Sequence, residues 1–188
     1  MMGVNKMRKL IITISICISV FLILTMFISC NSISKNTELV WVGYSGSAEF
    51  YFNALNRDKF DVDSIQHLAI FKFDSSTDLE QFKNDFADDF SFEQTRDDIQ
   101  SFEMATKNID DEYFKSDSLF IVYVPSISGS YRYKVENVTT KDENFTVYVK
   151  QANNPQIVSD DMAGWFLMLR IPKTQIEKCT VFDAQMVD

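Results

Sequence analysis

The chain has 188 residues and a formal net charge of −9, because 27 Asp and Glu outnumber 18 Lys and Arg. An acidic chain is repelled by nucleic acid and by anionic lipid headgroups, which excludes nucleic-acid binding as an expected function. With one His, three Cys and five Gly, the sequence also has few residues for a zinc site or a glycine-rich phosphate loop.

Residues 1–29 have the pattern of a secretory signal peptide. Three cations among the first nine residues precede an uncharged, mostly apolar run over residues 10–28, and the small Ser29 follows it. The tetrapeptide 27–30, Phe-Ile-Ser-Cys, resembles the lipobox of bacterial lipoproteins. The resemblance implies cleavage before Cys30 and a diacylglyceryl thioether on its sulfur.

A second interpretation of the same run is an uncleaved signal anchor, since about 19 apolar residues are enough to span a bilayer as a helix. The lipoprotein is favoured because an anchor needs no cysteine at this boundary. Both interpretations place the domain on the extracytoplasmic face of the cell membrane, because the cations lie before the apolar run. Cleavage removes three cations and no acid, which changes the net charge from −9 to −12.

Residues 30–37 then form the lipidated Cys30 and a polar linker that reaches at most about 25 Å. Residues 38–188 have the length of one globular domain. The membrane is thus the first expected partner, through the lipid on Cys30, and two acyl chains would hold the chain there stably.

The first half of the domain mixes strands and helices. Strands are predicted over residues 38–44 and 67–73, and the second is apolar on both faces, which is typical of an internal strand. Residues 48–53 have no decisive periodicity, and a turn is predicted at 56–58.

Two helices are predicted next. Thr77 and Glu80 fit a capping box, and an apolar stripe follows at Leu79, Phe82, Phe86 and Phe90, so a helix is predicted over Asp78–Asp89. A second helix is predicted over 97–107, and the acidic 110–112 is interpreted as a solvated turn.

The second half of the domain has a β pattern. Strands are predicted over 119–124, ending at Pro125, over 165–171, ending at Pro172, and over 179–182. A hairpin is predicted from the alternating segments 131–136 and 145–150, with its turn at 141–144. Helices followed by a run of strands predict an α+β fold with a mostly antiparallel sheet in a single domain.

Five segments within residues 113–173 carry a resemblance: 119–123, 128–132, the hairpin, 161–165 and 171–173. In these the chain resembles uncharacterised lipoproteins of Gram-positive bacteria. The order of a strand, the segment Ser128-Gly129-Ser130-Tyr131 and a hairpin is also similar to the C-terminal domain family of the PrcB protease-complex subunit. That similarity implies a small β-rich module that stabilises or contacts a partner protease. Ser130 stands where this family usually has a second Gly.

The best candidate surface combines residues 128–132 with residues 160–165, which flank predicted strands. Arg132 and Asp161 are expected to pair, and Tyr131 and Trp165 to form an aromatic patch of the kind enriched at interaction hot spots. The alternative is a structural corner in which Tyr131 and Trp165 pack into the core. The candidate partner-binding residues are therefore Ser128, Gly129, Tyr131, Arg132, Asp161 and Trp165.

Catalytic and metal sites find little support. The serines of residues 126–130 would need a base, and the one histidine, His67, begins an apolar strand. The acidic pairs at 88–89, 110–112 and 160–161 lack EF-hand spacing and are explained as solvated turns. Cys179 is interpreted as a buried small hydrophobe with no disulfide partner, so no cofactor or metal is expected.

These observations predict a lipid-anchored bacterial surface protein with no catalytic activity. Its expected function is binding, as an accessory or sensory module that contacts another extracytoplasmic protein, such as a protease or sensor, or a cell-wall ligand. The alternative is a hydrolase or transferase that acts on the cell wall, which requires His67 near Ser128 or Ser130.

Overall fold

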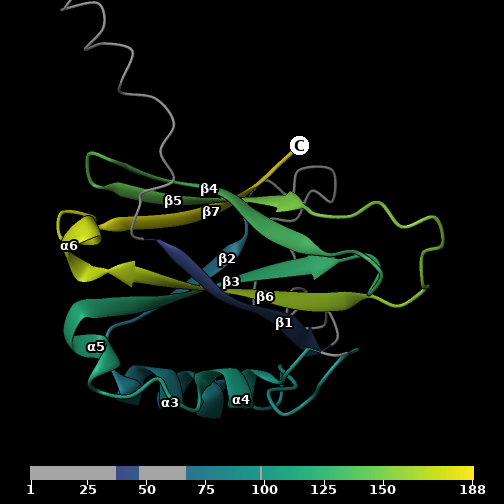
Figure 1. The fold of residues 1–188 in the computed structure, drawn as a ribbon, viewed down its shortest axis with the longest axis horizontal. Helices are drawn as coiled ribbons and strands as arrows, with labels where there is room; N and C mark the ends of the chain where they lie inside the picture. The colour runs from purple at the N-terminus through teal and green to yellow at the C-terminus, as the bar shows by residue number, and fades with distance from the viewer. Residues whose placement is uncertain (1–36, 47–66, 98) are drawn as a thin grey trace, which may run out of the picture. The chain divides into compact units, whose positions relative to one another are not determined.

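The computed structural model describes residues 37–46, 67–97 and 99–188 (Figure 1). These residues belong to one compact unit, Ile33–Asp188. The predicted signal segment 1–29, the lipidation site Cys30 and the segments 48–53 and 56–58 lie outside the described residues. Among the described residues, no helix is both long enough and apolar enough to cross a membrane.

Two β-sheets form the body of the domain. The four-stranded sheet has the order β1-β6-β3-β2, and all its pairs are antiparallel; its strands are β1 (Glu38–Gly46), β2 (Ala69–Phe73), β3 (Asp117–Ser126) and β6 (Ala163–Pro172). The three-stranded sheet has the order β4-β5-β7, with β4 (Tyr133–Lys141), β5 (Asn144–Gln151) and β7 (Val181–Val187). Only β5 and β7 run parallel, so the predicted α+β fold with mostly antiparallel sheets is confirmed.

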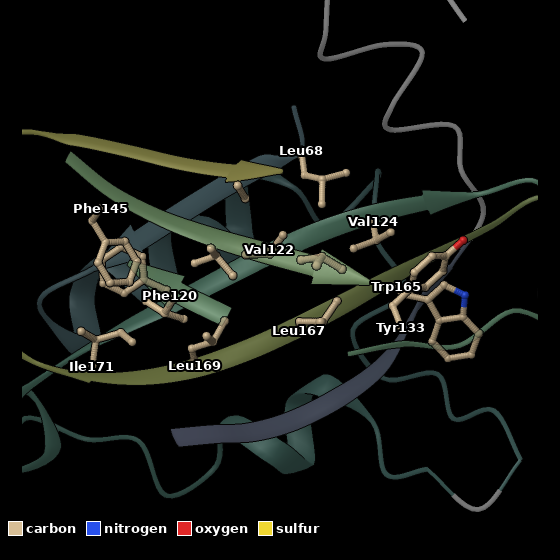
Figure 2. Packing of buried hydrophobic residues seen from close by; sticks show 14 of the residues in the cluster. Leu68, Phe120, Val122, Val124, Tyr133, Phe145, Trp165, Leu167, Leu169 and Ile171 are labelled. Carbon is tan, nitrogen blue, oxygen red and sulfur yellow. The ribbon is translucent and has the colours of Figure 1, made fainter. Parts of the chain in front are cut away.

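The four-stranded sheet is covered on both faces. Alternate residues of β3 illustrate this, because Leu119 and Ile121 pack in a cluster with the helices whereas Phe120 and Val122 pack against the three-stranded sheet. Figure 2 shows this second cluster, with Val122, Leu167 and Leu169 between the two sheets. Burial on both faces explains why β3 and β6 are apolar without alternation.

The prediction that the strand near residue 70 is internal is wrong, because β2 lies at the edge of its sheet. Its apolar character has another cause. Ile70 packs against the cluster between the sheets and Phe73 is buried in the helix-facing cluster, so both faces of this edge strand are covered. The backbone amide of Leu68 also donates to the carbonyl of Ala184, 2.7 Å away, which joins the edges of the two sheets.

The first helix begins earlier and ends earlier than predicted. Helix α3 spans Ser76–Asp85, and its N-cap is Ser75 rather than Thr77, because the Ser75 hydroxyl accepts a hydrogen bond from the Asp78 amide at 3.1 Å. The helix ends where Phe86 leaves helical geometry. The predicted apolar stripe is confirmed for Leu79 and Phe82, which α3 buries in the helix-facing cluster. Phe86 and Phe90 follow the end of the helix and pack in the same cluster.

The second predicted helix, 97–107, is much shorter. Helix α4 spans Phe102–Thr106 and is capped by Ser101. Asp97 has a positive φ of 56°, and the Ile99 amide donates to the Arg96 carbonyl, so the chain forms a turn here and not a helix. Two further short helices, α5 (Tyr113–Ser116) and α6 (Lys173–Ile176), flank β3 and β6.

The β predictions for the second half hold apart from their ends. β3 continues through Pro125 to Ser126, β4 begins at Tyr133 rather than at residue 131, and the last strand extends to Val187. The predicted hairpin is confirmed, since Lys141 pairs with Asn144 across a two-residue turn. Asp142 supplies the positive φ of 54° that this turn needs.

Candidate functional site

Two loops meet at one end of the sheets. The β3–β4 loop (127–132) and the β5–β6 loop (152–162) leave the same end, because Ser126 pairs with Ala163 across β3 and β6. The Gly129 amide donates to the Asp161 carbonyl at 2.9 Å. The fold therefore brings together the two segments that the candidate surface combines, residues 128–132 and 160–165, and we call this region the loop end.

Serine hydroxyls hold the two loops together. The hydroxyls of Ser128 and Ser130 each lie 2.9 Å from the hydroxyl of Ser159, and the Ser159 amide donates to Ser130 Oγ at 3.0 Å. Below them, Tyr133 Oη donates to Ser126 Oγ at 3.0 Å. Short side chains that bond to nearby backbone and to each other shape turns, so these serines act as a brace between the loops.

Asp161 is the anion at the centre of this brace. Its carboxylate accepts from Arg96 Nη2 at 2.9 Å and from the Gly129 amide at 3.1 Å. The Ser159 hydroxyl, followed by Arg96 and the Gly129 amide, lowers the pKa of Asp161 to about 2. Gly129 lies directly against Arg96, because a Cβ at this position would clash with the guanidinium group.

The predicted pair between Arg132 and Asp161 is wrong. Arg132 Nη2 instead lies 2.5 Å from Asp97 Oδ2, and its Nη1 donates to the Gly129 carbonyl at 2.7 Å. Arg96, from the segment before α4, forms the ion pair with Asp161 instead of Arg132. Both ion pairs thus connect the helical layer to the loop end.

Trp165 forms no surface patch, because its side chain is fully buried. The Arg132 guanidinium carbon lies 4.5 Å from the centre of its ring, and Tyr44 packs edge-on against it at 5.8 Å. Arg96 in turn lies over Tyr44 at 5.0 Å. We call this series, Arg96-Tyr44-Trp165-Arg132, the arginine–aromatic ladder. Such cation–π and edge-on contacts stabilise packed structure, so the ladder closes the end of the core.

The remaining predicted residues also serve the fold. Figure 2 shows Tyr133 and Trp165 at the same end of the core cluster, and the half-buried Tyr131 packs against that cluster. Ser128 and Gly129 are buried. The structural corner considered from the sequence is therefore the correct description of Ser128, Gly129, Tyr131 and Trp165.

The loop end nevertheless presents apolar side chains that sequence reasoning missed. Ile127 is 76% exposed and Ile157 is 86% exposed, and Val158 and Met162 are 45% and 51% exposed. These four account for half of the large hydrophobic side chains that are exposed within the described residues. The sequence carries a signal for them, because all four stand in segments with no strand or helix periodicity.

The residues considered for catalysis are engaged elsewhere. His67 Nδ1 lies 3.0 Å from Asp183 Oδ1, and within the described ranges no hydrogen bond joins His67 to Ser128 or Ser130. Cys179 is partly exposed, and burial raises the pKa of its thiol. In the described part of the chain, no group of three or more His, Cys, Asp or Glu is arranged to hold a metal ion.

An open groove of about 620 Å³ lies on the helical side of the domain. Phe90 and Phe92 form its apolar part, and Glu93 and Glu103 its acidic part. Glu103 is paired with Lys83 at 3.3 Å. The groove brings together no set of side chains with a recognisable chemistry.

No family model, curated protein or solved structure matches this chain.

Proposed function

We propose that this protein is a lipid-anchored module on the extracytoplasmic face of the cell membrane that binds another protein and catalyses no reaction. The observation that carries the proposal is the loop end, where exposed apolar side chains stand on loops fixed by hydrogen bonds and ion pairs.

Rigid presentation favours binding because little conformational entropy remains to be lost when a partner docks. At the loop end, Ser159 bonds to serines of the facing loop and Asp161 bonds to its backbone. Grouped, exposed apolar side chains are typical of interaction sites, whereas singly scattered ones are ordinary. Ile127 and Met162 are neighbours here, because they directly adjoin the paired residues Ser126 and Ala163.

The anchor is supported by the first thirty residues. Their cations, apolar run, Ser29 and Cys30 follow the order of a lipoprotein signal, and the polar linker places the domain within about 25 Å of the attachment point. No observation among the described residues favours the cell-wall hydrolase or transferase over a binding role, since His67 and the loop serines have separate partners.

The anchor is tested with Cys30→Ala in the full-length protein, labelled with a radioactive or alkyne-bearing fatty acid. We expect the wild-type chain to incorporate the label and stay in the membrane fraction, and the variant to lose the label. Unchanged membrane retention of an unlabelled wild-type chain would instead show the uncleaved anchor.

The binding role is tested by chemical cross-linking of intact cells followed by purification of the protein. We expect a discrete heavier species that contains a second protein. Recovery of the uncomplexed chain alone, across a series of cross-linker lengths, would contradict the proposed function.

A further inference from the structure

The chain enters the domain at the end opposite to the loop end. Across β1 and β6, Glu38 pairs with Arg170 and Gly46 pairs with Gly164. The β5–β6 loop immediately precedes β6, so residue 38 and this loop lie at opposite ends of the same sheet, roughly 30 Å apart along nine strand residues. Figure 1 shows β1 starting on the side of α6, away from the β5–β6 loop. We call the α6 side the tether end.

We propose that the loop end is the docking surface of the module, and that its partner is a different protein that presents an apolar surface with a basic rim. The inference rests on the proposed function, since it names the kind of partner that the proposed binding module takes. Ile127 and Met162 form the contact centre of this surface, and Ile157 stands on the same loop as Met162.

The basic rim is argued from the charges around the apolar side chains. Arg96 and Arg132 are already paired with Asp161 and Asp97, respectively. The exposed Asp160 forms no ion pair with any described residue, so it presents a free negative charge beside Met162. Complementary charge on a partner steers association and suppresses wrong partners.

Charge also argues against the two other occupants of such a surface. A second copy of this chain would bring together two domains of the same strongly negative net charge, −9 for the whole sequence. The bilayer is disfavoured because Asp160 and Asp161 adjoin the apolar side chains, and anionic headgroups repel carboxylates.

The test is site-specific photo-cross-linking of the full-length protein in its own cells. The photoreactive residue p-benzoylphenylalanine replaces Ile157 or Met162 at the loop end, or Val181 at the tether end. Val181 is a matched control, because it is 51% exposed, as is Met162, and it pairs with Asn144 at the far end of β5.

We expect one discrete protein adduct from positions 157 and 162 and none from position 181. The adduct protein, once identified and purified, is expected to bind the wild-type chain with an affinity that falls about tenfold in Ile127→Ser/Ile157→Ser. Its binding should also weaken as salt is raised and in Asp160→Asn, because the rim is basic, and unchanged binding in both tests would overturn the basic rim.

The other outcomes separate the two proposals. A protein adduct from position 181 alone would overturn the docking surface and leave the binding function standing. Adducts from none of the three positions would also overturn the docking surface, whereas the binding function is decided separately by the general cross-linking of intact cells. Loop-end adducts with a second copy of the chain, or with lipid, would overturn the different-protein partner.

Discussion

The two ends of the four-stranded sheet are closed by similar chemistry with different consequences. At the tether end, Arg170 lies 2.6 Å from Asp117 and over the ring of Tyr113. At the loop end, Arg132 pairs with Asp97 and lies over Trp165. The same combination of guanidinium, carboxylate and aromatic ring thus stabilises both ends.

The difference lies in what surrounds each arrangement. The carboxylate of the tether end belongs to strand β3 and is buried, whereas Asp97 and Asp161 of the loop end belong to loops and are partly exposed. The loop end also carries the two most exposed large apolar side chains of the described residues, Ile127 and Ile157. Both ends thus cover the hydrophobic core, and the loop end in addition exposes apolar side chains.

The largest expected effect comes from removing the aromatic centre of the ladder. Trp165→Ala removes a fully buried side chain between Tyr44 and Arg132, so we expect a loss of about 3–5 kcal/mol in the free energy of unfolding. Urea denaturation measures it, and Ile157→Ala is the control, expected within about 0.5 kcal/mol of wild type. A loss in Trp165→Ala as small as the control's would show that the ladder does not stabilise the loop end.

A smaller loss is expected at the tether end. Asp117→Asn removes the buried charge that Arg170 contacts, and hydrogen bonds to charged groups predict a loss of about 2 kcal/mol at neutral pH. The Arg170 hydrogen bond lowers the pKa of Asp117 below its ordinary value of 3.8. The stabilisation is therefore complete above that value and lost as the pH falls through the lowered pKa. The free energies of unfolding of wild type and Asp117→Asn, measured at a series of pH values, should converge as the pH falls. A difference between them that stays constant down to pH 2 would contradict this assignment.

A third test concerns the contact between Gly129 and Arg96. Gly129→Ala places a methyl group against the guanidinium, and because that side chain can move aside, we expect a loss of only about 1 kcal/mol. In a double-mutant cycle with Arg96→Ala, the Gly129→Ala penalty should largely disappear. A penalty that is unchanged without the arginine would place the strain in the backbone instead.

The smallest expected effect on the folded domain is a shift in the pKa of one carboxyl group, that of Asp161. NMR of a sample with labelled aspartate side chains should give a pKa for Asp161 of about 2. Ser159→Ala and Arg96→Ala should each raise it toward 3.8, because each removes a group that stabilises the carboxylate. Because the pKa is lowered in the folded chain, the stabilisation from Asp161 is present above pH 3.8 and lost as the pH falls toward 2. An unshifted wild-type value would show that the brace is open in solution.

Sequence reasoning succeeded where the signal was local. The hairpin at Lys141–Asn144, the apolar stripe of α3 and the strand that ends at Pro172 each depend on residues close together in the chain. The meeting of the two loops was also predictable, because antiparallel strands that pair side by side bring their connecting loops to a common end.

Sequence reasoning failed where residues far apart in the chain compete for the same partner. Asp161 had a candidate partner in Arg132, but Arg96, which is 65 residues away along the chain, holds that carboxylate. For Trp165 the sequence leaves a surface patch and a buried corner both open, because it does not reveal that Tyr44 and Arg132 cover the ring. The capping-box pattern predicts Thr77 as the N-cap of the helix, whereas the side chain of Ser75 caps it.

The central claim, that the module binds through its loop end, is tested most directly by comparing two single variants of matched exposure, Met162→Ser and Val181→Ser, in a binding titration with the purified partner. Both should leave the free energy of unfolding within about 0.5 kcal/mol of wild type, because both side chains are half exposed. The account predicts that Met162→Ser weakens the affinity severalfold while Val181→Ser leaves it unchanged. Equal affinities for the two variants, or a loss confined to Val181→Ser, would contradict it.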